Sequence, residues 1–210
     1  GARIDAMRER IEALDLEPEL RAIVLVSLME AADRVDSTAG GQMAYMKQWA
    51  PRALKPLELR MPDVLPSVGA PCRATQADAV EIAPEIEADL VYLDPPYNQH
   101  SYLGNYHCWE SLVLWDKPET YGIANKRIDV KTRKSAFNSR PGIGPALAAV
   151  IEGLRAPNLV VSFNDEGYLD REALTGMLSG RGHVQVIEIA HPRYVGARIG
   201  IHNPKGEKVG

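Results

Sequence analysis

The sequence is poor in cysteine, in phenylalanine and in long apolar runs, and it carries no excess of positive charge. Its two cysteines, Cys72 and Cys108, are too few for a disulfide framework, and no metal-ligand spacing surrounds them, so no metal site is predicted. No apolar run approaches the roughly 20 residues that cross a bilayer, so we expect no membrane contact. These absences favour a reducing, cytoplasmic setting.

The charge balance limits the binding partners. The formal net charge is -4, so no global positive field attracts nucleic acid, and any such binding must come from a local patch. With 210 residues, of which 45% are hydrophobic and 25% charged, the composition is that of an ordinary globular protein. This length is enough for one sizeable core and a small appendage.

Proline placement divides the chain into two regions. Upstream of residue 51, apolar residues recur at three- and four-residue spacing, which predicts amphipathic helices. Five prolines between residues 51 and 71 then indicate an extended connector. We therefore predict a helical appendage over residues 1–65 and an α/β core over residues 66–210.

The first half of the predicted core contains two strand-like segments. Residues 72–79 predict a short strand that ends at Asp78 and is followed by a brief helix. Residues 89–94 form a continuous apolar run before a carboxylate, typical of a parallel strand covered on both faces. Residues 116–142 are polar, basic and irregular in pattern.

The second half predicts the rest of an α/β fold. "GPALAAVIEGLRA" predicts a helix, "NLVVSF" a second buried strand, and Asp170 the cap of a helix over residues 171–179. Residues 183–190 and 197–202 alternate like a terminal antiparallel hairpin. This order of elements predicts a mostly parallel sheet layered with helices.

The stretch "DLVYLDPPYNQHSY", residues 89–102, combines features of a binding site. Ligands of open α/β sheets bind beyond the carboxyl ends of the strands, which is where Asp94 stands. The exocyclic amino group of adenine is a poor nucleophile, because its lone pair is delocalised into the ring. Two hydrogen-bond acceptors would favour a tetrahedral nitrogen. Asp94 can supply one of them and the Pro95 carbonyl the other.

The neighbouring residues suit the same chemistry. Pro95 and Pro96 stiffen the loop through their fixed φ, and Tyr97 can stack on the face of a base. A sulfonium methyl donor opposite the nitrogen would complete an in-line transfer without a metal or a covalent nucleophile. The alternative is a purely structural turn. The polar and aromatic residues that crowd after the loop favour a site: Asn98, His100, Tyr102, Asn105 and Tyr106.

Several segments together resemble a known family. "DPPYNQHSYLGNYHCWESLVLWDKPETYG", "KSAFNSR", "VVSFNDEGYLD" and "RYVGARIGIHNPKGEKVG" occur in the order expected of the D12-type, alpha-group DNA adenine-N6 methyltransferases, which use S-adenosylmethionine. They cover nearly all of residues 74–210. The resemblance implies a Rossmann-like methyltransferase sheet. It also implies methylation of adenine in double-stranded DNA, as in restriction–modification systems.

The resemblance assigns roles to individual residues. Asp94, Pro95, Pro96 and Tyr97 would form the catalytic loop that grips a flipped adenine, with Asp94 also bordering the methyl donor. Asp78 falls where the family places an acidic contact to the adenine moiety of the donor. The alternative for Asp78 is a cap on the helix that follows it.

One family feature is missing from the sequence. The Phe-x-Gly-x-Gly-like loop that holds the methionine part of the donor is not found, and residues 1–65 instead resemble the helical insert that follows this loop. We therefore expect a missing N-terminal segment, or a partner chain, to supply the donor loop.

A basic segment follows the DPPY loop. Residues 126–140, "KRIDVKTRKSAFNSR", hold six basic residues against Asp129 alone, and such a segment can hold phosphates. A solvated loop is a compatible alternative. The predicted substrate or DNA contacts are Asn98, Tyr102, Asn105, Lys131, Arg133, Lys134, Ser135, Arg140 and, in the terminal hairpin, Tyr194.

Two other kinds of function stay open at this level. The first is methylation of an amino group of guanine in RNA or of a protein glutamine, although such relatives more often carry Asn at the first loop position. The second is a non-catalytic DNA-binding partner or fragment, because the donor loop is absent from the sequence.

Overall fold

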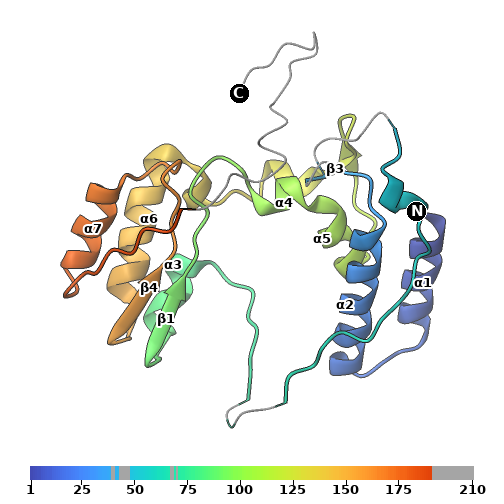
Figure 1. The fold of residues 1–210 in the computed structure, drawn as a ribbon, viewed down its shortest axis with the longest axis horizontal. Coiled ribbons are helices and arrows are strands. Elements are labelled where there is room, and N and C mark those ends of the chain that lie inside the picture. The colour runs from blue at the N-terminus through green and yellow to red at the C-terminus, as the bar shows by residue number, and fades with distance from the viewer. Residues whose placement is uncertain (39–40, 43–47, 67–68, 70, 191–210) are drawn as a thin grey trace.

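The structure is a computed structural model that describes residues 1–38, 41–42, 48–66, 69 and 71–190 (Figure 1). Its helices are α1 (Ala2–Ala13), α2 (Pro18–Arg34), α3 (Ala79–Ile82), α4 (Tyr102–Asn105), α5 (His107–Leu114), α6 (Arg140–Gly153) and α7 (Arg171–Ser179). Its strands are β1 (Leu90–Leu93), β2 (Thr120–Tyr121), β3 (Lys126–Arg127) and β4 (Asn158–Val161). No described helix is long and apolar enough to span a membrane.

The central feature is a parallel pair of strands. β1 lies beside β4, with Leu90 opposite Asn158 and Leu93 opposite Val161. The chain between them passes through α4, α5, the β2–β3 pair and α6, as a parallel crossover requires. The predicted parallel pairing of these two segments is confirmed.

Helix α6 builds the core on one face of this pair. Its residues Ile143, Leu147, Val150 and Ile151 are buried. The strand residues that pack against this cluster are Val91, Leu93 and Leu159. Asp170 caps α7 by accepting a hydrogen bond from the Ala173 N–H at 2.8 Å, as predicted.

The opposite face of the parallel pair is open in the described part of the chain. Leu90, Tyr92 and Val160 are 56%, 60% and 48% exposed. The prediction that residues 89–94 are covered on both faces is therefore wrong for the described residues. A pleated strand sends alternate side chains to opposite faces, and only the α6 side has a helical layer here.

The described residues also correct other strand predictions. The strands predicted over residues 72–79 and 183–190 are absent from the described sheets. Residues 71–78 and 183–190 contain neither helix nor strand. The second half of the predicted hairpin, residues 197–202, lies outside the described residues, as does Tyr194. The predicted irregular region 116–142 instead contains the antiparallel β2–β3 pair, with Thr120 opposite Arg127.

A second hydrophobic cluster joins the N-terminal helices to α5. It contains Ile11, Leu25, Leu28 and Leu112. The buried Arg8 guanidinium strengthens this contact by donating from Nε to the Leu112 carbonyl at 2.6 Å. Figure 1 shows α1, α2 and α5 together on one side of the molecule, with α3, α6 and α7 on the other. The division at residue 66 stays a prediction.

Candidate functional site

The DPPY loop begins where the parallel pair ends. The Ser162 N–H donates to the Leu93 carbonyl at 2.9 Å, and Asp94 is the next residue of the chain. Asp94 is exposed, whereas Pro95, Pro96 and Tyr97 are half-buried. The carboxylate therefore lies at the carboxyl end of β1 and is accessible to a ligand, which is the placement that the sequence predicts.

Two pairs of aromatic rings lie in and near the DPPY loop. The Tyr97 ring packs edge-on against Phe163, with centroids 6.2 Å apart and planes at 64°. Tyr102 and Tyr106 stack at 6.3 Å and 22°. Burial raises the pKa of Tyr102, and the nearby Asp94, Tyr97 and Tyr106 raise this pKa further. An exposed acceptor near aromatic rings is an arrangement that can hold a flat base bearing an amino group.

Backbone contacts fix the course of the loop. The Tyr97 carbonyl accepts from the Tyr168 N–H at 2.8 Å. A Cβ on Gly167 would lie 2.6 Å from the Phe163 ring and 3.2 Å from the Tyr97 Cβ, so only glycine allows this approach. The Asn98 side chain, a predicted substrate contact, accepts from the His100 N–H at 3.0 Å and closes a turn.

Among the described residues, two of the six basic residues of the segment 126–140 form ion pairs. Arg127 is 3% exposed, and its guanidinium donates two hydrogen bonds of 2.7 Å to Asp116 and bonds of 3.1 and 3.0 Å to Asp129. These bonds lower the pKa of both carboxyls and raise the pKa of Arg127. Arg133, a predicted DNA contact, donates to Glu110 at 2.8 Å. Their charges are thus largely neutralised within the protein.

The other predicted contacts of this segment have different surroundings. The Lys131 ammonium lies 4.2 Å from the centroid of the Tyr121 ring, and the Arg140 guanidinium 4.9 Å from that of Tyr168. Neither of these contacts pairs the cation with a carboxylate. Lys134 is exposed and forms no ion pair among the described residues. The Ser135 hydroxyl accepts from the Phe137 N–H at 3.2 Å and so caps a short turn.

Two further predicted residues make local contacts. The Asp78 carboxylate accepts from the Val80 N–H at 2.8 Å and caps α3, which is the structural alternative weighed for this residue. Asn105 lies in α4, and its carbonyl accepts from the Gln42 N–H at 2.6 Å. Neither contact tests a role in binding.

The segments that directly follow the two parallel strands begin without glycine. β1 leads directly into Asp94 and two prolines, and β4 leads into Ser162, Phe163 and Asn164. Neither parallel strand is therefore followed at once by a glycine turn that would bring backbone N–H groups to a ligand. The methionine part of a donor has no such cradle among the described residues.

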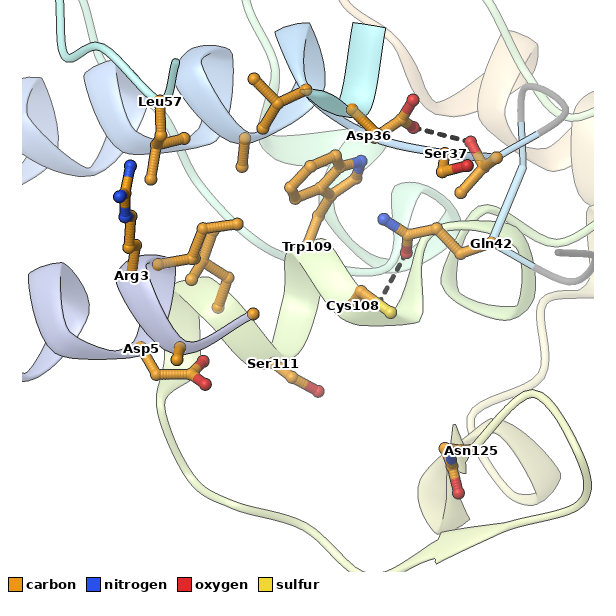
Figure 2. A pocket seen from close by; sticks show the side chains of 18 of the residues that line it. Arg3, Asp5, Asp36, Ser37, Gln42, Leu57, Cys108, Trp109, Ser111 and Asn125 are labelled. Atoms are coloured by element: carbon orange, nitrogen blue, oxygen red, sulfur yellow. Dashed lines mark hydrogen bonds between the residues drawn. The ribbon is translucent and has the colours of Figure 1, made fainter. Parts of the chain in front are cut away.

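A separate cavity of about 1050 Å³ lies between α1, α2, α5 and the β2–β3 turn (Figure 2). Trp109 projects into it, and the Gln42 side chain accepts from the Cys108 N–H at 2.7 Å at its edge. Burial lowers the pKa of His107, which also lines the cavity. None of residues 94–106 lines it, so it is distinct from the surroundings of the DPPY loop.

Comparisons with known proteins agree with the sequence pattern. Residues 1–142 match the family described as D12 class N6 adenine-specific DNA methyltransferase. The chain is 33% identical over 180 residues to the type II methyltransferase M.FokI of Planomicrobium okeanokoites. It is 31% identical over 199 residues to the modification methylase StsI of Streptococcus sanguinis. It is 29% identical over 199 residues to the type II methyltransferase M.NlaIII of Neisseria lactamica.

These alignments cover most of the chain but only part of each relative. They include 86%, 91% and 92% of the chain, and 27%, 30% and 58% of the respective relative. The chain thus spans less than two thirds of each of these proteins. No solved structure matches the chain.

Proposed function

This chain belongs to the D12 class of N6 adenine-specific DNA methyltransferases, as the resemblance predicted, and on that premise we propose that the protein methylates the N6 amino group of adenine in DNA. The methyl donor that the family implies is S-adenosylmethionine. The observation that carries the proposal is the exposed Asp94, which lies at the carboxyl end of β1, inside the DPPY sequence and near Tyr102.

In the proposed reaction the loop activates the amino group. Asp94 and the Pro95 carbonyl accept hydrogen bonds from the two N–H groups of a flipped adenine, which localises the nitrogen lone pair. The rings of Tyr97 and its neighbours cover the face of the base. When bound, S-adenosylmethionine supplies an electrophilic methyl group. Preorganised acceptors speed such a reaction because they need not reorient as charge develops.

Several finer assignments belong to the same proposal. We assign β1 and β4, with α6 on one face, to a Rossmann-like sheet, which their parallel pairing and helical crossover support. We assign Lys131, Lys134 and Arg140 to phosphate contacts, because none of them forms an ion pair among the described residues. The donor contact of Asp78, the base-pocket role of Tyr194 and an external source of the donor loop stay predictions.

The test replaces Asp94 by Asn in the full-length protein. Asn has nearly the shape of Asp, but one carboxylate oxygen, which accepts hydrogen bonds, is replaced by an NH₂ group, which donates them. The methylation rate should therefore fall by about 100- to 1000-fold. The matched control is Asp89→Asn, which changes the exposed carboxylate just before the amino end of β1 and should leave the rate unchanged. The rate is measured by transfer of labelled methyl groups to duplex DNA, followed by digestion to nucleosides.

The product analysis decides between this function and its competitors. Label in N6-methyladenine from DNA supports the proposal. Label in RNA guanine or protein glutamine, or an Asp94→Asn variant that keeps the full rate, contradicts it. DNA binding without any methyl transfer by the wild-type protein identifies a non-catalytic DNA-binding protein.

A further inference from the structure

A side chain from a distant segment holds the backbone that follows the DPPY sequence. The Asn138 amide nitrogen donates to the Asn98 carbonyl at 2.9 Å and to the His100 carbonyl at 3.1 Å. One amide group thus uses both of its hydrogens on two carbonyls of the same turn, across about forty residues of sequence. Asn138 was not among the residues singled out in the sequence.

The orientation of this amide follows from its partners. Both neighbours are backbone carbonyl oxygens, which only accept hydrogen bonds. If the amide were turned over, its oxygen would face two other oxygens, and both hydrogen bonds would be lost. The group at this position therefore has to be a double donor, a requirement that an aspartate of almost the same shape cannot meet.

The turn that carries Asn138 packs against the core. Asn138 ends the short 3-10 turn η4 (Ala136–Asn138), and the Phe137 side chain of this turn is buried against α6. A Cβ on Gly142 would lie 2.7 Å from the Ala136 carbonyl, so this turn and the start of α6 are in close contact. The amide is therefore a fixed point relative to the α6 core.

A second attachment holds the same loop from the side of β4. The Tyr168 N–H donates to the Tyr97 carbonyl at 2.8 Å, and the Tyr168 hydroxyl donates to the Gln99 side chain at 3.1 Å. The Tyr168 ring lies under the Arg140 guanidinium. Residues 97–100 are thus held by Asn138 on one side and by Tyr168 on the other.

We propose that Asn138 is a positioning residue of the methyl transfer, which acts by holding the backbone of residues 98–100 so that Asp94, the Pro95 carbonyl and Tyr97 keep the geometry that grips the amino group. This inference rests on the proposed function. Two prolines restrict φ inside the loop but do not anchor its far end, and the Asn138 amide provides that anchor. Displacements of about 1 Å at a reacting group can cost about 100-fold in rate.

The test compares two aspartate substitutions in the full-length protein. Asn138→Asp places carboxylate oxygens against the two carbonyls and should lower kcat by about 10- to 100-fold, with little change in the KM for DNA. Asn158→Asp is the matched control, because Asn158 also donates from its amide to a carbonyl, that of Asp89, but does so at the opposite end of the sheet. Its kcat should equal that of the wild type.

A second readout does not depend on activity. Amide hydrogen exchange of His100 and Tyr168, whose N–H groups are hydrogen-bonded in and to this loop, should be about 5- to 30-fold faster in Asn138→Asp, since the two hydrogen bonds of Asn138 that hold the loop are lost. Asn158→Asp should leave exchange at these residues unchanged. Asn138→Gln, which keeps the amide but displaces it by one methylene, should fold and show smaller changes of the same sign.

The two readouts separate this inference from the proposed function. Unchanged exchange and unchanged kcat in both Asn138 variants overturn the positioning role. A loss of kcat without faster exchange in the loop also overturns it, because the effect would then not act through the loop. A wild-type protein that does not methylate DNA refutes the proposed function and, with it, the role in transfer, whereas exchange still tells whether Asn138 holds the loop.

Discussion

Arg127 shows that a residue of the basic segment 126–140 can have a structural role. Its sequence context is a basic segment, yet its side chain is buried between Asp116 and Asp129. A guanidinium suits this place because its planar fork meets carboxylates at two points. The interaction ties β3 to the segment that follows α5.

Replacing Arg127 by Met should reduce the free energy of unfolding by about 1.5–3 kcal/mol at pH 7, the range for hydrogen bonds to charged groups. Denaturant unfolding followed by tryptophan fluorescence measures this loss. The control is Arg60→Met, because Arg60 pairs with Glu58 on the surface and such pairs contribute about 0–1 kcal/mol. Equal stability of the two variants would show that the Arg127 cluster adds nothing to folding.

The same cluster predicts a dependence on pH. Arg127 lowers the pKa of Asp116 and Asp129 in the folded state, whereas the ordinary value for an unfolded chain is about 3.9. Their contribution to stability is therefore present above about pH 4 and is lost as the pH falls through the folded-state pKa. The difference in the free energy of unfolding between the wild type and Arg127→Met should therefore become smaller as the pH falls below about 4.

At the scale of elements, α6 organises the part of the fold that carries the DPPY loop. It buries five aliphatic side chains and contacts α3, α7 and both parallel strands through one cluster. The turn that bears Asn138 comes immediately before it. The stability of this helix and the geometry of the loop are therefore linked.

Leu147→Ala in α6 should destabilise the protein by about 2–5 kcal/mol, because it removes a side chain that is 1% exposed and leaves a cavity. Leu65→Ala, at a position that is 84% exposed, should change stability by no more than about 0.5 kcal/mol. Denaturant unfolding compares the two. A Leu147→Ala cost as small as that of Leu65→Ala would mean that α6 does not form the core.

At the scale of the whole molecule, net charge limits the proposed binding to DNA. The net charge is -4, and both Arg127 and Arg133 form ion pairs with carboxylates of the same chain. The proposed phosphate contacts therefore involve cations that form no ion pair with a described carboxylate. Lys134 is exposed and lies three residues from Phe137, on the segment that leads to Asn138.

Lys134→Ala in the full-length protein should weaken binding to duplex DNA of any sequence and reduce the slope of log K against log salt by about 0.9, the value for one phosphate contact. Fluorescence anisotropy at several salt concentrations measures both effects. Lys55→Ala, in the exposed connector, is the control and should leave the slope unchanged. An unchanged slope in Lys134→Ala would remove this residue from the proposed interface.

The position of Asp94 was predictable because it depends on residues that are adjacent in the sequence. An apolar run followed directly by Asp94 and two prolines places a carboxylate at a strand end, whatever the rest of the chain does. The contacts of Arg127 and Asn138 were not predictable in this way. Their partners lie up to forty residues away, and no spacing rule connects them.

The open face of β1 illustrates the same limit. An apolar run shows that a strand prefers burial, but only the placement of other elements decides which of its faces are covered. The sequence by itself determined the family and the order of the two strand segments, since both follow from motifs and apolar runs that are read along the chain. The tertiary structure alone decided which cations are neutralised and which amide holds the loop. Both depend on which distant segments the packing brings together.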